Sequence, residues 1–295
     1  MKDNGSGRRG EGSRKTDGAS GRAAARVQGL LIERTAARIR HKLLIMSGKG
    51  GVGKSSIAAQ LSVGFARRGL RVGLLDVDLH GPSIAGIMGL SGPVKITADH
   101  FALPLQGAHG VKVISIQFLL DMPDRAVIWR GAAKTAAIRQ FMADVQWGDL
   151  DYLLIDAPPG TGDEPLGVSK NVPGARAVLI TTPQQLALDD VRRSIRFCRT
   201  IGLPILGLIE NMGPFLCPHC GGEVPVFQEG GGRQLAMKAG IPLIGSLPFD
   251  PAVVMACDGG LGSTPEISGP AFAKSLEACI DRVVALTKRK MPKMS

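Results

Sequence analysis

The ten residues SGKGGVGKSS (47–56) restrict the fold of this chain more than any other stretch. They contain the phosphate-loop pattern G-x-x-x-x-G-K-S, whose fixed positions are Gly48, Gly53, Lys54 and Ser55. The apolar run at 42–47 is typical of a buried strand, and residues 55–69 have helical periodicity that ends at a glycine. Strand, glycine-rich loop and helix in this order form the context that a phosphate-binding loop requires.

The residue types of this loop suit the phosphates of a nucleotide. Glycines let the backbone curl until successive N–H groups point at phosphate oxygens, and the N-terminus of the helix adds partial positive charge. Lys54 is placed to reach the β- and γ-phosphates, and the Ser55 hydroxyl is a ligand for Mg²⁺. We therefore expect ATP and Mg²⁺ as cofactors. The expected binding set is Gly48, Lys49, Gly50, Gly51, Val52, Gly53, Lys54, Ser55 and Ser56.

Short apolar runs alternate with helical patterns along the rest of the chain. The runs are residues 71–78, 111–119, 151–156, 175–182 and 203–212, and the helical stretches are 23–40, 131–146, 184–200 and 269–288. Continuous apolar strands separated by helices are typical of a mostly parallel sheet that is covered on both faces. We predict an α/β fold with a doubly wound, mostly parallel sheet, formed by one domain over residues 23–295.

The N-terminal arm carries most of the positive charge. Residues 1–42 hold +7 of the formal net charge of +11, and residues 1–22 are rich in Gly, Ser, Arg and Lys, so we expect a disordered basic arm. No aromatic residues interleave its charges, which argues against nucleic acid as a partner. No run approaches the roughly 18 apolar residues of a membrane span, and the N-terminus lacks the apolar centre of a signal peptide. We expect a cytoplasmic protein without a membrane partner.

Acidic residues end two of the predicted strands, at the sheet edge that faces ligand in such folds. Asp76 and Asp78 are two positions apart, so their carboxylates lie on the same side of an extended segment. One can hold Mg²⁺ through water while the other orients the attacking water. Asp156 ends another predicted strand, and we expect its carboxylate to lie behind the direct ligands of Mg²⁺. Gly160 offers a backbone N–H for the γ-phosphate.

Two of the five cysteines, Cys217 and Cys220, lie three positions apart in the loop sequence FLCPHCGGEV. This spacing suits a metal site or a redox pair. The redox pair is the weaker interpretation, because the motif does not open a helix after a first strand. Half of a tetrathiolate zinc site has identical spacing, and His219 adds a further candidate ligand. No metal role is assigned to the other three, Cys198, Cys257 and Cys279.

With Lys49 directly after the first glycine, KGGVGKS resembles the P-loop NTPases of the deviant Walker A type, which include the cell-division and chromosome-partition ATPases. The resemblance implies that Lys49 reaches the nucleotide of the opposite subunit in a sandwich homodimer and stabilises transition-state charge there. It also implies that Lys54 and Asp78 are catalytic. Asp78 would orient the water, with Asp76 on the metal side. Asn211 resembles the adenine-binding asparagine of the family, although a turn residue is nearly as good an interpretation.

Seven motifs in order narrow the resemblance to the Mrp-type ATPases, which carry iron–sulfur clusters: IMSGKGGVGKSS, DLHGPS, IWRG, DAPPGTGDE, TTPQQLAL, NMGPFLCPHCG and SLPFDP. The resemblance covers about residues 25–285. It implies ATP binding and slow hydrolysis, coupled to holding a [4Fe–4S] cluster and delivering it to apo iron–sulfur proteins. A [4Fe–4S] cluster needs four thiolates and one chain offers one close pair, so Cys217 and Cys220 of two subunits would share it.

The chain also departs from this family. No cysteine precedes Cys198, and only the basic arm precedes the ATPase region, so we do not expect target recognition through the N-terminal extensions of some members. An alternative from another class is a positioning ATPase, with a basic arm that binds DNA or membrane and a cysteine pair that holds structural zinc.

Overall fold

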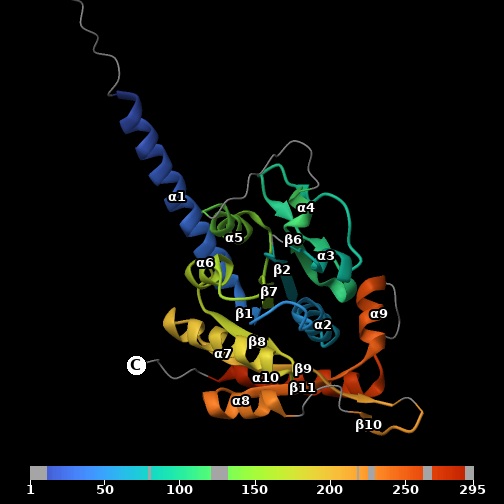
Figure 1. Cartoon of the computed structure of the whole chain (residues 1–295). Coiled ribbons are helices and arrows are strands. Elements are labelled where there is room, and N and C mark those ends of the chain that lie inside the picture. Colours follow the sequence, from blue (N-terminus) through green and yellow to red (C-terminus); the bar gives the residue numbers. More distant parts are fainter. Residues whose placement is uncertain are drawn as a thin grey trace, which may run out of the picture.

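The centre of the molecule is a nine-stranded sheet, seen in a computed structural model that describes residues 12–78, 81–120, 132–217, 219–224, 230–261 and 268–289 (Figure 1). The strand order is β10-β9-β8-β1-β7-β2-β6-β5, and β11 also pairs with β9. The strands are β1 (Ile39–Ser47), β2 (Val72–Asp76), β5 (Leu105–Gln106), β6 (Lys112–Ser115), β7 (Leu150–Asp156), β8 (Ala175–Thr181), β9 (Ile205–Leu216), β10 (Glu223–Val224) and β11 (Leu243–Phe249). Only β5 and β10 pair antiparallel within this sheet, so the predicted, mostly parallel sheet is confirmed.

Helices cover both faces of the sheet because the connections run in two directions from β1. The helices are α1 (Gly12–Arg38), α2 (Lys54–Arg67), α3 (Ile84–Ile87), α4 (Gln117–Leu120), α5 (Ala132–Asp144), α6 (Asp163–Asn171), α7 (Gln185–Thr200), α8 (Gly231–Ala239), α9 (Pro251–Gly259) and α10 (Pro270–Lys288). The β1–α2–β2 connection runs one way along the sheet, and β7–α6–β8 runs the other way. Right-handed crossovers therefore place α2 and α6 on opposite faces.

The core is centred on β1, which lies between β7 and β8. Leu43, Leu44, Ile45 and Met46 are fully buried, because helices cover both sides of the strand. This arrangement explains why the run at 42–47 is continuously apolar instead of alternating. It also holds the end of β1, and with it the phosphate loop, in a fixed position.

The N-terminal helix differs from its predicted bounds. Helix α1 begins at Gly12, so residues 12–22 continue a helix where we expected a disordered arm. Its other end is shorter than predicted, because Ile39 already pairs with Leu150 as the first residue of β1. A separate pair of short strands, β3 (Lys95–Ile96) and β4 (Ala102–Leu103), lies between β2 and β6 in the chain.

Two predicted strands also end differently. The run at 111–119 is a strand only to Ser115, and α4 follows it. The run at 203–212 extends to Leu216, because its second half pairs with β10 and β11. The IWRG motif at 128–131 lies outside the described residues. Among the described helices, none is long and apolar enough to cross a bilayer.

Candidate functional site

The phosphate loop joins the end of β1 to α2 through two glycines in the left-handed region. Gly51 has φ 76° and Gly53 has φ 79°. Residues other than glycine adopt these backbone conformations only at an energetic cost. Gly48 is required for a different reason, since a Cβ there would lie 2.3 Å from the backbone carbon of Asp190 in α7. The loop thus packs directly on α7 while its backbone curls ahead of the α2 N-terminus.

A buried ion pair under this loop joins Lys54 to Asp156, and the half-buried Ser55 contacts the same carboxylate. Lys54 Nζ lies 2.6 Å from Asp156 Oδ1, and the Ser55 hydroxyl donates to Asp156 Oδ2 at 2.6 Å. Lys54 is 7% exposed and Asp156 is fully buried. Burial raises the pKa of Asp156, and the charge of Lys54 opposes this shift. Asp156 therefore holds both the lysine and the serine in place before any phosphate arrives.

Asp76 stands beside Asp156 on the neighbouring strand, in register with it. Its carboxylate accepts hydrogen bonds from the Asp78 backbone N–H at 3.0 Å and the Ser115 hydroxyl at 3.0 Å. Burial, and then the negative charge of Asp156, raise the pKa of Asp76 to about 7. A bound cation would favour the ionised carboxylate. The oxygen donors Ser55, Asp76 and Asp156 therefore fit a hard cation such as Mg²⁺.

Three further residues of the predicted site lie at the same edge of the sheet, and each makes a hydrogen bond within the chain. Asp78 is 8% exposed and its Oδ1 accepts from the Gly81 backbone N–H at 3.3 Å. Lys49 is half-buried, and its Nζ lies 3.1 Å from Gln184 Oε1. The Gly160 N–H donates to the Ser47 carbonyl at 2.8 Å, so binding a γ-phosphate requires this contact to open. The roles given to these residues stay predictions.

Asn211 is tied to the phosphate loop. Its Nδ2 donates to the Val52 carbonyl at 3.0 Å, and a Cβ on Gly53 would lie 2.4 Å from the same nitrogen. A cavity of about 120 Å³ lies beside it, with Pro248 and Phe249 among its lining residues. The predicted adenine contact is compatible with this position, which also gives Asn211 a structural role.

The sequence interpretation did not assign two polar residues at this edge. Ser115 bonds Asp76 from the end of β6, and Gln184 contacts Lys49 from the residue before α7. Ser115 lies inside the run 111–119, which we predicted as one strand, so its position at the end of β6 could not be read from the sequence. Gln184 lies within the TTPQQLAL motif, but no role was assigned to it, because only the tertiary structure brings the start of α7 to the phosphate loop.

Cys217 and Cys220 lie in the turn between β9 and β10, which projects from the body of the molecule (Figure 1). The turn is closed by the Gly221 N–H donating to the Cys217 carbonyl at 2.8 Å. Backbone N–H groups of Cys220 and His219 point at the Cys217 sulfur and lower its pKa. Cys220 is exposed and Cys217 half-buried. Across the described ranges, no group of three or more His, Cys, Asp or Glu residues could hold a metal within one chain.

The other cysteines are separated from this turn and buried. Burial raises the pKa of Cys198 and of Cys279 to about 12. Burial also raises the pKa of Cys257. These thiols are therefore poor metal ligands at neutral pH.

The loop between β1 and α2, with a buried Lys–Asp pair behind it and acidic residues on the adjacent strand ends, defines this molecule as a P-loop NTPase. It belongs to the ParA family, and the matching family model, described as "NUBPL iron-transfer P-loop NTPase", covers residues 38–284.

Relatives and solved structures agree with this assignment. The chain is 43% identical over 262 residues to the human cytosolic Fe-S cluster assembly factor NUBP2, covering 87% of this chain and 96% of the relative. It is 45% identical over 223 residues to the iron-sulfur cluster carrier protein of Saccharolobus solfataricus, covering 75% of each. A nucleotide-binding protein from Archaeoglobus fulgidus in complex with ADP matches with TM-score 0.72 and 38% identity, covering 83% of this chain and 96% of that one. MinD from Pyrococcus furiosus, at 22% identity and TM-score 0.58, shares the fold.

Proposed function

We propose that this chain is an ATP-dependent carrier or scaffold that holds a [4Fe–4S] cluster at a homodimer interface and delivers it to apo iron–sulfur proteins. One observation carries the proposal: a phosphate-binding site and a projecting pair of thiols, one with a lowered pKa, occur on the same chain. Two of its relatives, an Fe-S cluster assembly factor and an iron-sulfur cluster carrier, support it by their names. Relatives named as cytosolic also support a cytoplasmic location.

ATP would bind with its phosphates against the loop backbone and the α2 N-terminus. Lys54 would turn from Asp156 toward the β- and γ-phosphates, exchanging one negative partner for another. Ser55 would bind Mg²⁺ directly, with Asp76 and Asp156 behind it. When bound, Mg²⁺ neutralises phosphate charge as the γ-phosphoryl group leaves.

Hydrolysis would require Asp78 and, from the opposite subunit, Lys49. Asp78 would orient the attacking water, because it follows the same strand end as Asp76. Lys49 is held by a neutral amide, Gln184, and among the residues that the structure describes it has no acidic partner to give up when it turns toward a second chain. Its charge would stabilise the transition state in trans, in the manner of an arginine finger.

The cluster, as cargo, would be held by Cys217 and Cys220 of two chains. A two-fold axis brings a patch against its own copy, so two projecting turns supply four thiolates. Backbone N–H groups directed at the Cys217 sulfur favour the thiolate, which is the form that binds iron. A projecting turn would also leave the cluster accessible to a recipient protein.

Anaerobic reconstitution with iron and sulfide tests this proposal. We expect about four iron atoms per two chains, with the absorption of a [4Fe–4S] cluster. Cys217→Ala and Cys220→Ala should each lose the cluster, while Cys198→Ala, which removes a buried thiol on α7, should keep it. A full cluster in either turn variant would refute the proposal. Zinc at one ion per two chains, with no iron retained, would support the structural-zinc alternative.

A second measurement addresses hydrolysis separately. We expect slow, Mg²⁺-dependent ATP hydrolysis that Asp78→Asn reduces at least about 100-fold with little change in ATP affinity, because the carboxylate acts on water. An unchanged rate in Asp78→Asn would remove Asp78 from the mechanism without bearing on the cluster site.

A further inference from the structure

One strand, β9, runs from the phosphate loop to the cysteine turn within a single chain. Near its middle, the Asn211 side chain donates to the Val52 carbonyl of the loop at 3.0 Å. The strand ends at Leu216, and Cys217 follows directly. The segment 212–216 is therefore all that separates the contact with the phosphate loop from the first thiol.

The second half of β9 is held by the parallel strand β11. Phe249 of β11 pairs with Phe215 of β9, after two shifts of register between the strands. A Cβ on Gly213 would lie 3.2 Å from the Leu247 carbonyl oxygen, so the two backbones approach closely. The ring centroids of Phe215 and Phe249 lie 6.3 Å apart, in an edge-to-face arrangement at 61°. The position of β11 thus acts directly on the residues just before the cysteine turn.

The cavity of about 120 Å³ at the phosphate loop is lined by both of these strands. Met212 comes from β9, Phe249 from the end of β11, and Gly53 from the loop itself. Because Gly53 is one of its walls, the cavity lies within reach of the base of a nucleotide whose phosphates contact the loop. A base in the cavity would contact Phe249, whose ring contacts Phe215, two positions before Cys217.

Met212 has a backbone conformation that its surroundings must maintain. Its φ is 58°, in the left-handed region, which a residue with a Cβ occupies at an energetic cost. Such a conformation persists only where neighbouring contacts determine it. The neighbours here are Asn211, which bonds the phosphate loop, and Gly213, which packs on β11. A change of φ at Met212 would redirect the residues that lead into the turn.

We propose that a nucleotide base in this cavity orders the cysteine turn of the same chain, with Phe249 and Phe215 as the positioning residues. The base restricts the Phe249 ring and holds Met212 in its left-handed conformation. The Phe215 ring then fixes the strand that leads into the turn. This inference rests on the proposed ATP binding. It does not depend on a cluster, because it concerns the turn of one chain without cargo.

Hydrogen–deuterium exchange of the full-length chain without cargo, read by mass spectrometry with and without MgADP, tests this coupling. The reporting amides are those of Cys217 and Gly221, which donate to the carbonyls of Gly222 and Cys217 and so close the turn. We expect saturating MgADP to slow their exchange at least about three-fold, because a bound ligand restricts local opening.

Phe215→Leu should abolish this slowing, because it removes the ring that packs on Phe249. It should keep ADP affinity within about three-fold of the unchanged chain, since Phe215 is not among the residues that line the cavity. Phe215→Tyr, which keeps the ring, should keep the effect of MgADP on the turn.

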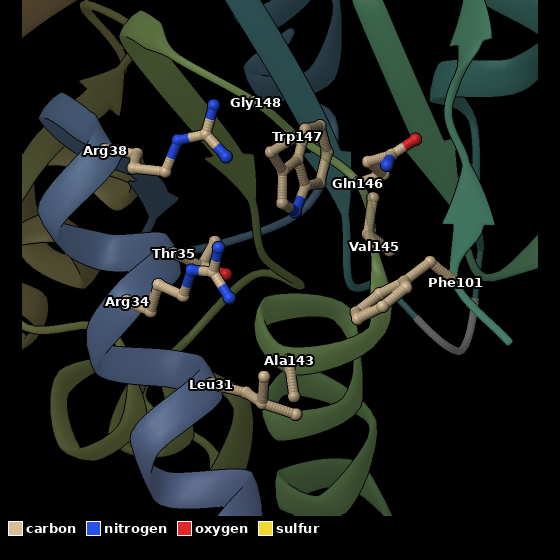
Figure 2. A pocket seen from close by; sticks show the side chains of 10 residues that line it. All are labelled: Leu31, Arg34, Thr35, Arg38, Phe101, Ala143, Val145, Gln146, Trp147 and Gly148. Atoms are coloured by element: carbon tan, nitrogen blue, oxygen red, sulfur yellow. The ribbon is translucent and has the colours of Figure 1, made fainter. Parts of the chain in front are cut away.

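Phe101→Leu is the matched control, because it makes the same change at another half-buried phenylalanine. Figure 2 shows Phe101 beside Val145 and Trp147, in a separate cavity at the amino ends of β1 and β7. This variant should keep the full effect of MgADP on the turn. Peptides from the hairpin of β3 and β4 should exchange at the same rate with and without MgADP in every protein.

The proposal is overturned if ADP binds and leaves the exchange of the turn unchanged, or if Phe215→Leu and Phe101→Leu respond alike. It is also overturned if the hairpin slows as much as the turn, since ADP then stabilises the whole molecule. A chain that does not bind ADP would overturn the proposed ATP binding, and this inference with it.

Discussion

At the scale of single residues, the nucleotide site is governed by how two buried carboxylates are neutralised. Asp156 has Lys54 and Ser55 as partners, whereas Asp76 has only hydrogen-bond donors and a raised pKa. Lys54 therefore neutralises a buried carboxylate, and the proposed mechanism gives it a second role toward the phosphates of ATP. Replacing Lys54 with an uncharged residue separates its role toward Asp156 from its role toward ATP.

We expect Lys54→Met to destabilise the nucleotide-free protein by about 3–5 kcal/mol at pH 8, because Asp156 is left as an unpaired buried charge. The loss should be smaller at pH 5.5, where Asp156 takes up a proton more readily. Urea unfolding at both pH values measures this difference. Lys49→Met, which breaks only a contact with a neutral amide, should cost less than about 1 kcal/mol. Equal losses in the two variants would contradict the role given to the buried pair.

Cys217 is expected to ionise below the usual range of a thiol, which is near pH 8.5. In Cys220→Ser the backbone N–H groups that favour the thiolate remain, so Cys217 should still be alkylated with a midpoint below that range. Mass spectrometry of iodoacetamide-treated protein across pH 6–10 gives the midpoint, and the buried Cys198 and Cys279 should stay unmodified. A midpoint at or above 8.5 would contradict the N–H contribution.

At the scale of elements, the contact between the phosphate loop and α7 fixes the site. The backbone of Gly48 approaches Asp190 so closely that no side chain fits between them. Because Gln184 precedes the same helix and contacts Lys49, a shift of α7 would disturb both Lys49 and the backbone of the phosphate loop at Gly48.

We therefore expect Gly48→Ala to destabilise the protein by about 1–3 kcal/mol, since its Cβ forces backbone to move. ATP affinity should fall at least ten-fold. For stability, Gly50→Ala is the control in the same loop, because the nearest neighbour of the added Cβ, Pro159, would be 3.9 Å away. Unfolding curves and equilibrium binding of a labelled ATP measure both effects. Similar losses in the two variants would indicate general loop damage instead of the contact with α7.

Another set of contacts ties the last helix to the sheet at the amino ends of the strands. Tyr152 on β7 bonds the Thr287 hydroxyl of α10 at 2.8 Å and stacks on Phe65. His41 on β1 packs beside Tyr152 and lies 3.2 Å from Arg176. Burial, and then the charge of Arg176, lower the pKa of His41 to about 4.

This lowered pKa predicts a loss of stability in mild acid. The unfolded chain binds a proton near pH 6.5 and the folded one near pH 4, so unfolding takes up a proton as pH falls through this window. From pH 7 to pH 4.5, His41→Phe should lose about 1–2 kcal/mol less than the unchanged chain, because the partly solvated ring gives only part of the full effect. Urea unfolding across the window measures the two slopes. Parallel slopes would contradict the assignment.

At the scale of the whole molecule, the proposed homodimer would bring the nucleotide and cysteine sites, at the carboxyl edge of the sheet, against a second chain. Lys49 should act only when two chains meet, so we expect Lys49→Ala to keep ATP affinity within about three-fold and to lose ATP-dependent dimerisation and hydrolysis. Light scattering with and without ATP measures dimerisation, and the hydrolysis assay measures the rate of ATP hydrolysis. A dimer that forms normally and hydrolyses ATP at the usual rate would contradict action in trans.

The sequence by itself determined the α/β class, the position of the phosphate loop and the residues at the strand ends. These depend on local patterns: a glycine-rich loop between a strand and a helix, and apolar runs that end in Asp76 and Asp156. The approach of Gly48 to α7 and the pairing of Lys54 with Asp156 were decided only by the tertiary structure. So was the raised pKa of Asp76. Each of these depends on burial or on a contact between segments far apart in the chain, which periodicity and spacing do not encode.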